Sequence, residues 1–250
     1  MSEIPAGSSI QGRKVGFILR STSLLIPLIV AVVAHLEFSW IGFSPTDEGW
    51  VLSDSRRILA GQVPHRDFLA LQTPGAEFLH VSEVMFGGDY TFWVARLVAW
   101  LQIAVIAWAW PEILSKLSRK ELTLWHRTVL GLISFAFTAC MLPILIAPAL
   151  DGLFLISVGL LLVLRRESLS KLSGYFLIGF SYLCKQNFIF VFPAVLVLLG
   201  DWKRIRYWAA AVFPGALYVA LLSAFGALPD AVIQLGSTRA SFVKRRLCLW

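Results

Sequence analysis

Two adjacent carboxylates, Asp47 and Glu48, follow a long apolar run and stand where a helix is expected to begin. A carboxylate is ordinarily ionised at neutral pH, so it can take the proton of an attacking hydroxyl group. Each lies four residues before an apolar residue, Val51 or Leu52, so both are predicted to extend the apolar stripe of that helix. Capping of the helix N-terminus is the plainer explanation of Asp47, and both explanations stay open.

Positive charge that could neutralise a departing phosphate is also available. Arginine and lysine bind phosphate through charge-assisted hydrogen bonds. The candidates are Arg56, Arg57, Arg66 and Lys185. Lys185 interrupts an apolar run together with Gln186, and snorkelling to lipid headgroups is its alternative role. Pairing with Asp54 or with lipid phosphates is the alternative for the two adjacent arginines.

The remaining polar candidates do not suggest a metal site. His65 has no second histidine at metal-ligand spacing, and the three cysteines are widely separated. Asp151 stands beside Gly152 at an expected turn between two apolar segments, where capping of a helix explains it equally well. We therefore predict no cofactor and no metal site, and dependence on a divalent metal stays open.

Composition places the chain among integral membrane proteins. Of its 250 residues, 58% are hydrophobic and 15% are charged, and the mean hydropathy is +0.75, well above the roughly half-apolar composition of soluble domains. The net charge of +7 comes from cationic clusters between apolar runs. That pattern is typical of membrane topology, so nucleic acid is not expected as a partner.

The apolar runs predict an all-α, polytopic protein with about seven spans, since one span needs about 20 apolar residues. The expected spans cover residues 15–36, 91–110, two within 128–164, two within 172–200, and 207–225. Each middle stretch is divided in two because one helix would be too long, or would leave a basic loop on the outer side. Pro143 and Pro148 mark the first of these turns.

Basic residues beside the spans set the expected orientation. Residues 1–14 form a cytoplasmic N-terminus, and residues 15–226 form the transmembrane module with an outer loop at 37–90. Residues 227–250 form an extracytoplasmic tail, which the basic residues Arg239 and Lys244–Arg246 make a poor fit to that side. A truncated chain is one explanation of this misfit.

The outer loop is predicted to contain two amphipathic helices that lie in the membrane interface. The first opens at Ser44 and Pro45, where Ser44 and Asp47 have the spacing of a capping box, and it ends at Gly61. The second opens at Pro74 and ends at two glycines, 87–88. Topology places this loop, Asp151 and Lys185 on one extracytoplasmic side.

Short segments of the chain resemble those of a known family. Segments of the outer loop and the following span are T-D-E-G at 46–49, R-R-I-L-A-G-Q-V-P-H-R-D-F at 56–68, T-P-G at 73–75, F-G-G at 86–88 and V-A-R-L at 94–97. Later segments are A-L-D-G at 149–152 and G-F-S-Y-L-C-K-Q-N-F at 179–188. Together they resemble the outer turns of the C-type glycosyltransferases, which include protein O-mannosyltransferases and lipid A aminoarabinose transferases.

The resemblance implies an enzyme in a plasma membrane, most characteristically a bacterial one. It would transfer a sugar from a polyprenyl-phosphate donor to a hydroxyl of a lipid, glycan or protein acceptor outside the cytoplasm. Asp47 would correspond to the catalytic carboxylate with Glu48 beside it, and Lys185 to a basic residue that binds the donor. Asp151 falls where the family often has a second acid. The supporting residues within the similar segments are Gln186, His65 and Asp67.

Direct displacement assisted by one carboxylate base would invert the anomeric centre. A transporter or binding protein in which Asp151 and Lys185 line a path is the alternative from another class. Transporters usually place ionisable residues near mid-membrane and often show inverted repeats, and neither feature is found. An inactive or truncated member of the same family is a third alternative.

Overall fold

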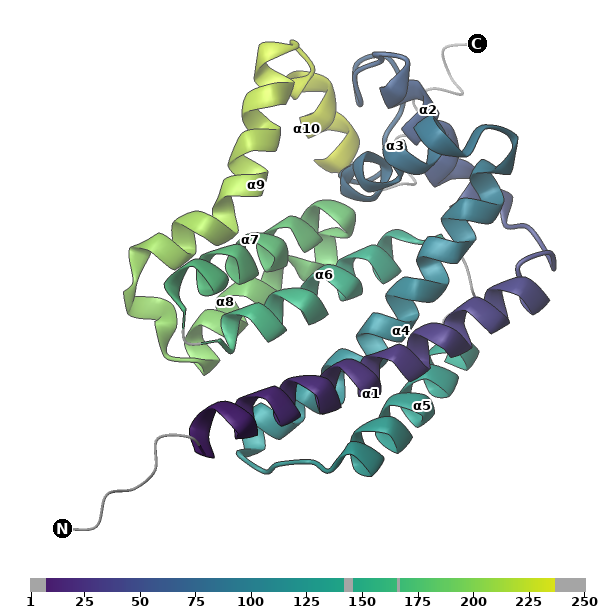
Figure 1. Cartoon of the computed structure of the whole chain (residues 1–250). Coiled ribbons are helices and arrows are strands. Elements are labelled where there is room, and N and C mark those ends of the chain that lie inside the picture. Colours follow the sequence, from purple (N-terminus) through teal and green to yellow (C-terminus); the bar gives the residue numbers. More distant parts are fainter. Residues whose placement is uncertain (1–7, 142–145, 166, 237–250) are drawn as a thin grey trace.

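The computed structural model describes residues 8–141, 146–165 and 167–236, and every regular element within these ranges is helical (Figure 1). The all-α class is therefore confirmed. Expectations for Pro143 and for the basic residues of the tail, Arg239 and Lys244–Arg246, fall outside the described residues. The expected N-terminal segment 1–14 and tail 227–250 lie only partly within them.

Helices occur where the apolar runs predict them. They are α1 (Ser8–Phe38), α4 (Thr91–Ser118), α5 (Leu124–Met141), α6 (Pro148–Val163), α7 (Ser168–Cys184), α8 (Val191–Leu198) and α9 (Ile205–Ala224). The stretch 128–164 divides into α5 and α6, as expected. The stretch 172–200 divides at Lys185 into α7 and a shorter segment, the 3₁₀ turn η3 (Gln186–Phe190) followed by α8.

Two helical stretches of the described residues are long and apolar enough to cross a membrane. The first is the continuous segment Gly75–Ser118, which contains α3 (Gly75–Gly87), the 3₁₀ turn η2 (Gly88–Tyr90) and α4, and the second is α9. The other apolar helices are shorter than such a test requires. The number of spans therefore stays a prediction.

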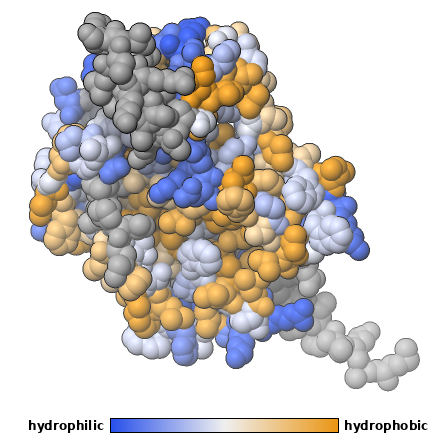
Figure 2. Space-filling view, turned by 180° about the vertical axis from the view of Figure 1, so that it is seen from behind, coloured by the Kyte–Doolittle hydropathy of each residue, from blue (hydrophilic) through white to orange (hydrophobic). Residues whose placement is uncertain are grey.

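The outer faces of several helices are apolar. On α1, Leu25, Ile29 and Leu36 are each more than half exposed, at helical spacing. On α9, Phe213, Leu217 and Leu221 form a similar stripe. Figure 2 shows apolar side chains over a large share of one face of the molecule. A helix at a water-facing surface normally presents polar residues outward, and soluble monomers rarely expose large contiguous apolar patches.

Glycines allow the helices of the second half to approach closely. The described structure leaves no room for a Cβ atom on Gly179 in α7, which would collide with the backbone carbonyl of Ala211 in α9. Gly159 in α6 lies similarly against the backbone of Gly174 in α7. Small residues at such crossings bring helix backbones into contact, as in membrane helix pairs.

Replacing Gly179 by alanine is expected to destabilise the protein by about 1–3 kcal/mol, because the added methyl group separates α7 from α9. Thermal unfolding of the detergent-solubilised chain measures the effect. Gly131→Ala in α5 is the matched control, since the nearest atom to its Cβ is Cγ of Pro27 at 3.9 Å. The control should be neutral or stabilised by up to about 1 kcal/mol. Equal unfolding temperatures for the two variants would contradict the close crossing.

The outer loop contains the two expected helices. A π-helical turn, η1 (Pro45–Gly49), leads into α2 (Trp50–Leu59). The second helix is α3 (Gly75–Gly87), which continues through the 3₁₀ turn η2 (Gly88–Tyr90) into α4. Ser55 of α2 donates a hydrogen bond of 2.8 Å to the carbonyl of Glu77 in α3, so the two helices are directly joined. The helices are therefore packed against one another at the end of the bundle where α4 begins.

The predicted capping box is shifted by one residue. The backbone N–H of Ser44 donates to Oε2 of Glu48 at 3.0 Å, and Ser44 makes no side-chain cap of the helix. The π turn explains the shift, because Gly49 N–H bonds to the carbonyl of Ser44 five residues back, at 3.1 Å. The wider turn carries Glu48 into the position expected for Asp47.

Candidate functional site

The outer loop meets the ends of α6 and α7. Thr73 donates a hydrogen bond of 3.2 Å to the carbonyl of Tyr182. Gly75 lies so close to the backbone of Leu183 and Cys184 that a Cβ atom would not fit. These contacts place the segment that opens α3 directly beside the turn that carries Lys185.

Glu48 is fully buried and paired with Arg96 of α4. Arg96 donates from Nε to Oε1 and from Nη2 to Oε2 of Glu48, both at 2.8 Å. Its other donors reach the carbonyls of Ser39, Ile41 and Gly42 at 2.7–2.9 Å. Both carboxylate oxygens are thus engaged, which favours a positioning role for Glu48 over proton transfer.

Asp47 lies in a different environment from Glu48. It is exposed, and its Oδ2 accepts a long hydrogen bond of 3.5 Å from the hydroxyl of Ser44. The expectation that both carboxylates extend the apolar stripe is therefore wrong for Asp47. Of the two, Asp47 is the carboxylate that an incoming hydroxyl can reach.

A buried polar network joins α3, α4 and α6. Nδ1 of His80 contacts Glu83, and its Nε2 lies 3.2 Å from Oδ2 of Asp151. Gln102 donates to the other oxygen of Asp151 at 2.8 Å. All four side chains are buried, so Asp151 acts here as the link that holds three helices together.

Of this network only Asp151 was a candidate from the sequence. The missed residues are His80, Glu83 and Gln102. His80 and Glu83 stand three residues apart on α3, and this i,i+3 spacing is the signal that could have paired them. Among the described residues, no group of three or more His, Cys, Asp or Glu side chains is placed to hold a metal ion.

Two further acids of the loop are buried. Asp54 accepts a hydrogen bond from the indole of Trp50, and burial raises the pKa of Asp54 against the opposing effects of that bond and of Arg57. Glu77 is buried in α3, and its Oε2 has no hydrogen-bond partner among the described residues. Neither acid is accessible enough to serve as the first contact for a substrate.

The candidate cations differ in availability. Arg66 forms a two-point ion pair with Asp67, with both distances 2.9 Å, and this bond lowers the pKa of Asp67 to about 2. Arg56 and Arg57 are exposed on α2. Lys185 and Gln186 are exposed where α7 ends. The pair of Arg66 and Asp67 is therefore better explained as local structure than as a phosphate site.

His65 anchors the loop to the last helices. Its Nε2 lies 2.7 Å from the hydroxyl of Tyr218 in α9, and its Nδ1 lies 2.9 Å from Oε1 of Gln234 in α10 (Leu228–Gly236). A neutral ring that donates from Nδ1 and accepts at Nε2 satisfies both contacts. Burial lowers the pKa of His65, which favours that neutral form. His65 thus has a structural role in this arrangement.

Comparison of the chain with models of known protein families, with curated proteins and with solved structures finds no match. The proposals that follow therefore depend on the residues and geometry of this chain and on the resemblance described above.

Proposed function

We propose that the chain is a multi-pass integral membrane protein of about seven spans with its N-terminus in the cytoplasm. The apolar stripes on the outer faces of α1 and α9 support lipid contact. The loops that join α4 to α5, α6 to α7 and α8 to α9 carry basic residues. In Figure 1 these loops lie toward the lower left, as does the start of α1, whereas α2 and α3 lie at the upper right. This separation matches the positive-inside pattern.

We further propose that the protein is a glycosyltransferase that uses a polyprenyl-phosphate sugar. The observation that carries the proposal is the exposed Asp47 on the first turn of an outer-loop helix whose neighbour Glu48 is held by Arg96. This arrangement fixes the backbone at Asp47 while leaving its carboxylate accessible. A base held rigidly beside the acceptor contributes both proton transfer and orientation.

In the proposed reaction, Asp47 takes the proton of the acceptor hydroxyl as its oxygen attacks the anomeric carbon. The bond from that carbon to the lipid phosphate breaks, and the phosphate leaves with the bonding electrons. The exposed cations Arg56 and Arg57 of α2 and Lys185 at the end of α7 would balance the phosphate charge. Attack opposite the leaving phosphate inverts the anomeric centre.

A panel of polyprenyl-phosphate sugars tests this function with the purified full chain in lipid vesicles. Turnover of at least one donor to free polyprenyl phosphate, with the sugar recovered on a hydroxyl acceptor, is the expected result. Uptake of a solute into the vesicles without lipid-phosphate turnover would support a transporter instead. Absence of turnover across the panel would contradict the proposed activity.

A further inference from the structure

A basic pocket of about 440 Å³ lies between the loops at the end of the bundle opposite the outer loop. Four cationic side chains line it, and no carboxylate does: Arg165, Lys171, Arg204 and Arg206. Lys171 pairs with the buried Asp201 behind the pocket at 2.7 Å. The three arginines have no carboxylate partner among the described residues, so the pocket carries an excess of positive charge.

Two of these arginines are held close together by one aromatic residue. The hydroxyl of Tyr207 accepts a hydrogen bond from Arg206 at 3.0 Å and another from Arg204 at 3.5 Å. Both guanidinium groups also lie over the Tyr207 ring, 4.8 and 5.9 Å from its centroid. Adjacent like charges repel, and an anion between them would relieve that repulsion.

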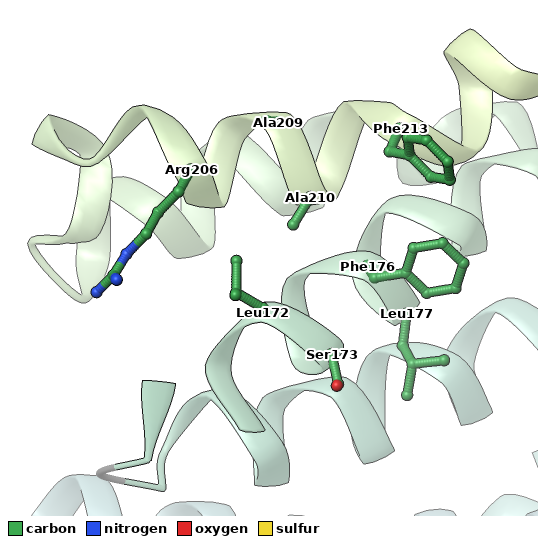
Figure 3. Close-up of a pocket in the computed structure, with 8 residues that line it drawn as sticks. All are labelled: Leu172, Ser173, Phe176, Leu177, Arg206, Ala209, Ala210 and Phe213. Atoms are coloured by element: carbon green, nitrogen blue, oxygen red, sulfur yellow. The ribbon is translucent and has the colours of Figure 1, made fainter. Parts of the chain in front are cut away.

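An apolar groove of about 530 Å³ adjoins the basic pocket and shares Arg206 with it. The groove runs between α7 and α9, and Figure 3 shows Arg206 at one end and the rings of Phe176 and Phe213 at the other. These two rings have centroids 6.3 Å apart. Ala209 and Ala210 leave space along α9, and more than half of Phe213 is exposed, so the groove opens on the outer surface.

We propose that this pocket and groove together bind one anionic phospholipid of the cytoplasmic leaflet. Its phosphate would lie among Arg165, Arg204 and Arg206, and the first part of one acyl chain would lie against Leu172, Phe176 and Phe213. From Arg206 to Phe213 the helix rises about 10 Å. This length is about a third of the hydrocarbon core, which is roughly 30 Å thick, so the groove can hold the first part of an acyl chain. Basic pockets between membrane helices at the cytoplasmic side bind acidic headgroups in this way. The inference rests on the proposed membrane placement and not on sugar transfer.

Lipid retention by the purified full chain tests the proposal in the absence of any sugar donor. The detergent-solubilised protein is offered equal amounts of phosphatidylglycerol and phosphatidylcholine, and the bound lipid is counted by native mass spectrometry. One phosphatidylglycerol should be retained in preference to phosphatidylcholine. In the double variant Arg204→Gln/Arg206→Gln this preference should fall about 25-fold, since each cation near an acidic headgroup contributes roughly fivefold.

Two controls separate this site from general charge effects and from misfolding. Arg119→Gln/Lys120→Gln removes the same charge from the loop between α4 and α5 and should retain phosphatidylglycerol as the parent chain does. Ala210→Trp fills the groove without changing charge and should lose the lipid. Each variant must elute as the parent does in size-exclusion chromatography.

Three results would overturn the proposal. The first is equal retention of the two lipids by the parent chain. The second is equal loss in Arg204→Gln/Arg206→Gln and in the control double variant. The third is displacement of phosphatidylglycerol by glycerol 3-phosphate at the same concentration, because the groove would then contribute nothing. Each of these outcomes is independent of whether the protein transfers a sugar.

Discussion

Replacing Asp47 by asparagine is expected to lower kcat/KM for sugar transfer about 100- to 10,000-fold, the range lost when a general base is removed. Asparagine has the same shape as aspartate but cannot take the proton of the hydroxyl. The folded structure should persist, because Asp47 is exposed and the hydrogen bond that it accepts from Ser44 is a long one, 3.5 Å. Initial rates with a polyprenyl-phosphate sugar and the purified full chain measure the effect.

Asp89→Asn is the matched control for this prediction. Asp89 is an exposed carboxylate of the same outer loop, near the start of α4. Its substitution removes the same charge from the same surface and should leave the rate unchanged. Undiminished transfer by Asp47→Asn, with Asp89→Asn equally active, would remove the assigned role of Asp47. Equal loss in both variants would show that the net charge of the loop, rather than one base, governs the rate.

The helices could be predicted from the sequence because their signal is local. A run of apolar residues of a given length, bounded by basic residues and prolines, specifies a helix whatever its neighbours are. The division of 172–200 at Lys185 follows from this reasoning, and α7 ends at Cys184. The continuation of α4 through Pro111 to Ser118 does not follow, because a proline is tolerated within long apolar helices when neighbouring groups satisfy the freed carbonyl.

The partners of the polar residues could not be predicted in the same way. Glu48 meets Arg96, and His65 meets Tyr218, across long separations in the chain. Spacing indicates the face on which a side chain lies but not which distant residue that face meets. The shift of the cap from Asp47 to Glu48 has a local cause, since the π turn at Pro45–Gly49 closes its hydrogen bond over one residue more than an α-helical turn does.

The position of Arg96 in the sequence is a signal for its buried partner. An arginine within a predicted apolar span is costly unless a carboxylate or backbone carbonyl groups accept its hydrogen bonds. The search for a partner leads to the acids of the adjacent outer loop, of which Glu48 is the one the structure supplies. The motif V-A-R-L therefore contains the residue that positions T-D-E-G, and the two segments form one unit.

Replacing Arg96 by alanine is expected to destabilise the protein by about 3–5 kcal/mol, the cost of leaving one partner of a buried ion pair uncompensated. Glu48 would remain buried without its cation, and the carbonyls of Ser39, Ile41 and Gly42 would lose their donors. Thermal and denaturant unfolding of the detergent-solubilised chain measure the loss. Arg57→Ala, which removes an exposed arginine of α2, should change stability by no more than about 0.5 kcal/mol.

A double-mutant cycle distinguishes the ion pair from simple loss of packing. Glu48→Gln removes the buried charge, so the further change Arg96→Ala should cost less in that background than in the parent chain. We expect a coupling of about 1–3 kcal/mol, as for residues in one hydrogen-bond network. Additive effects of the two changes would contradict the pairing. Glu48 and Arg96 hold the turn that carries Asp47. Variants that lose this ion pair but remain folded should therefore also transfer sugar more slowly.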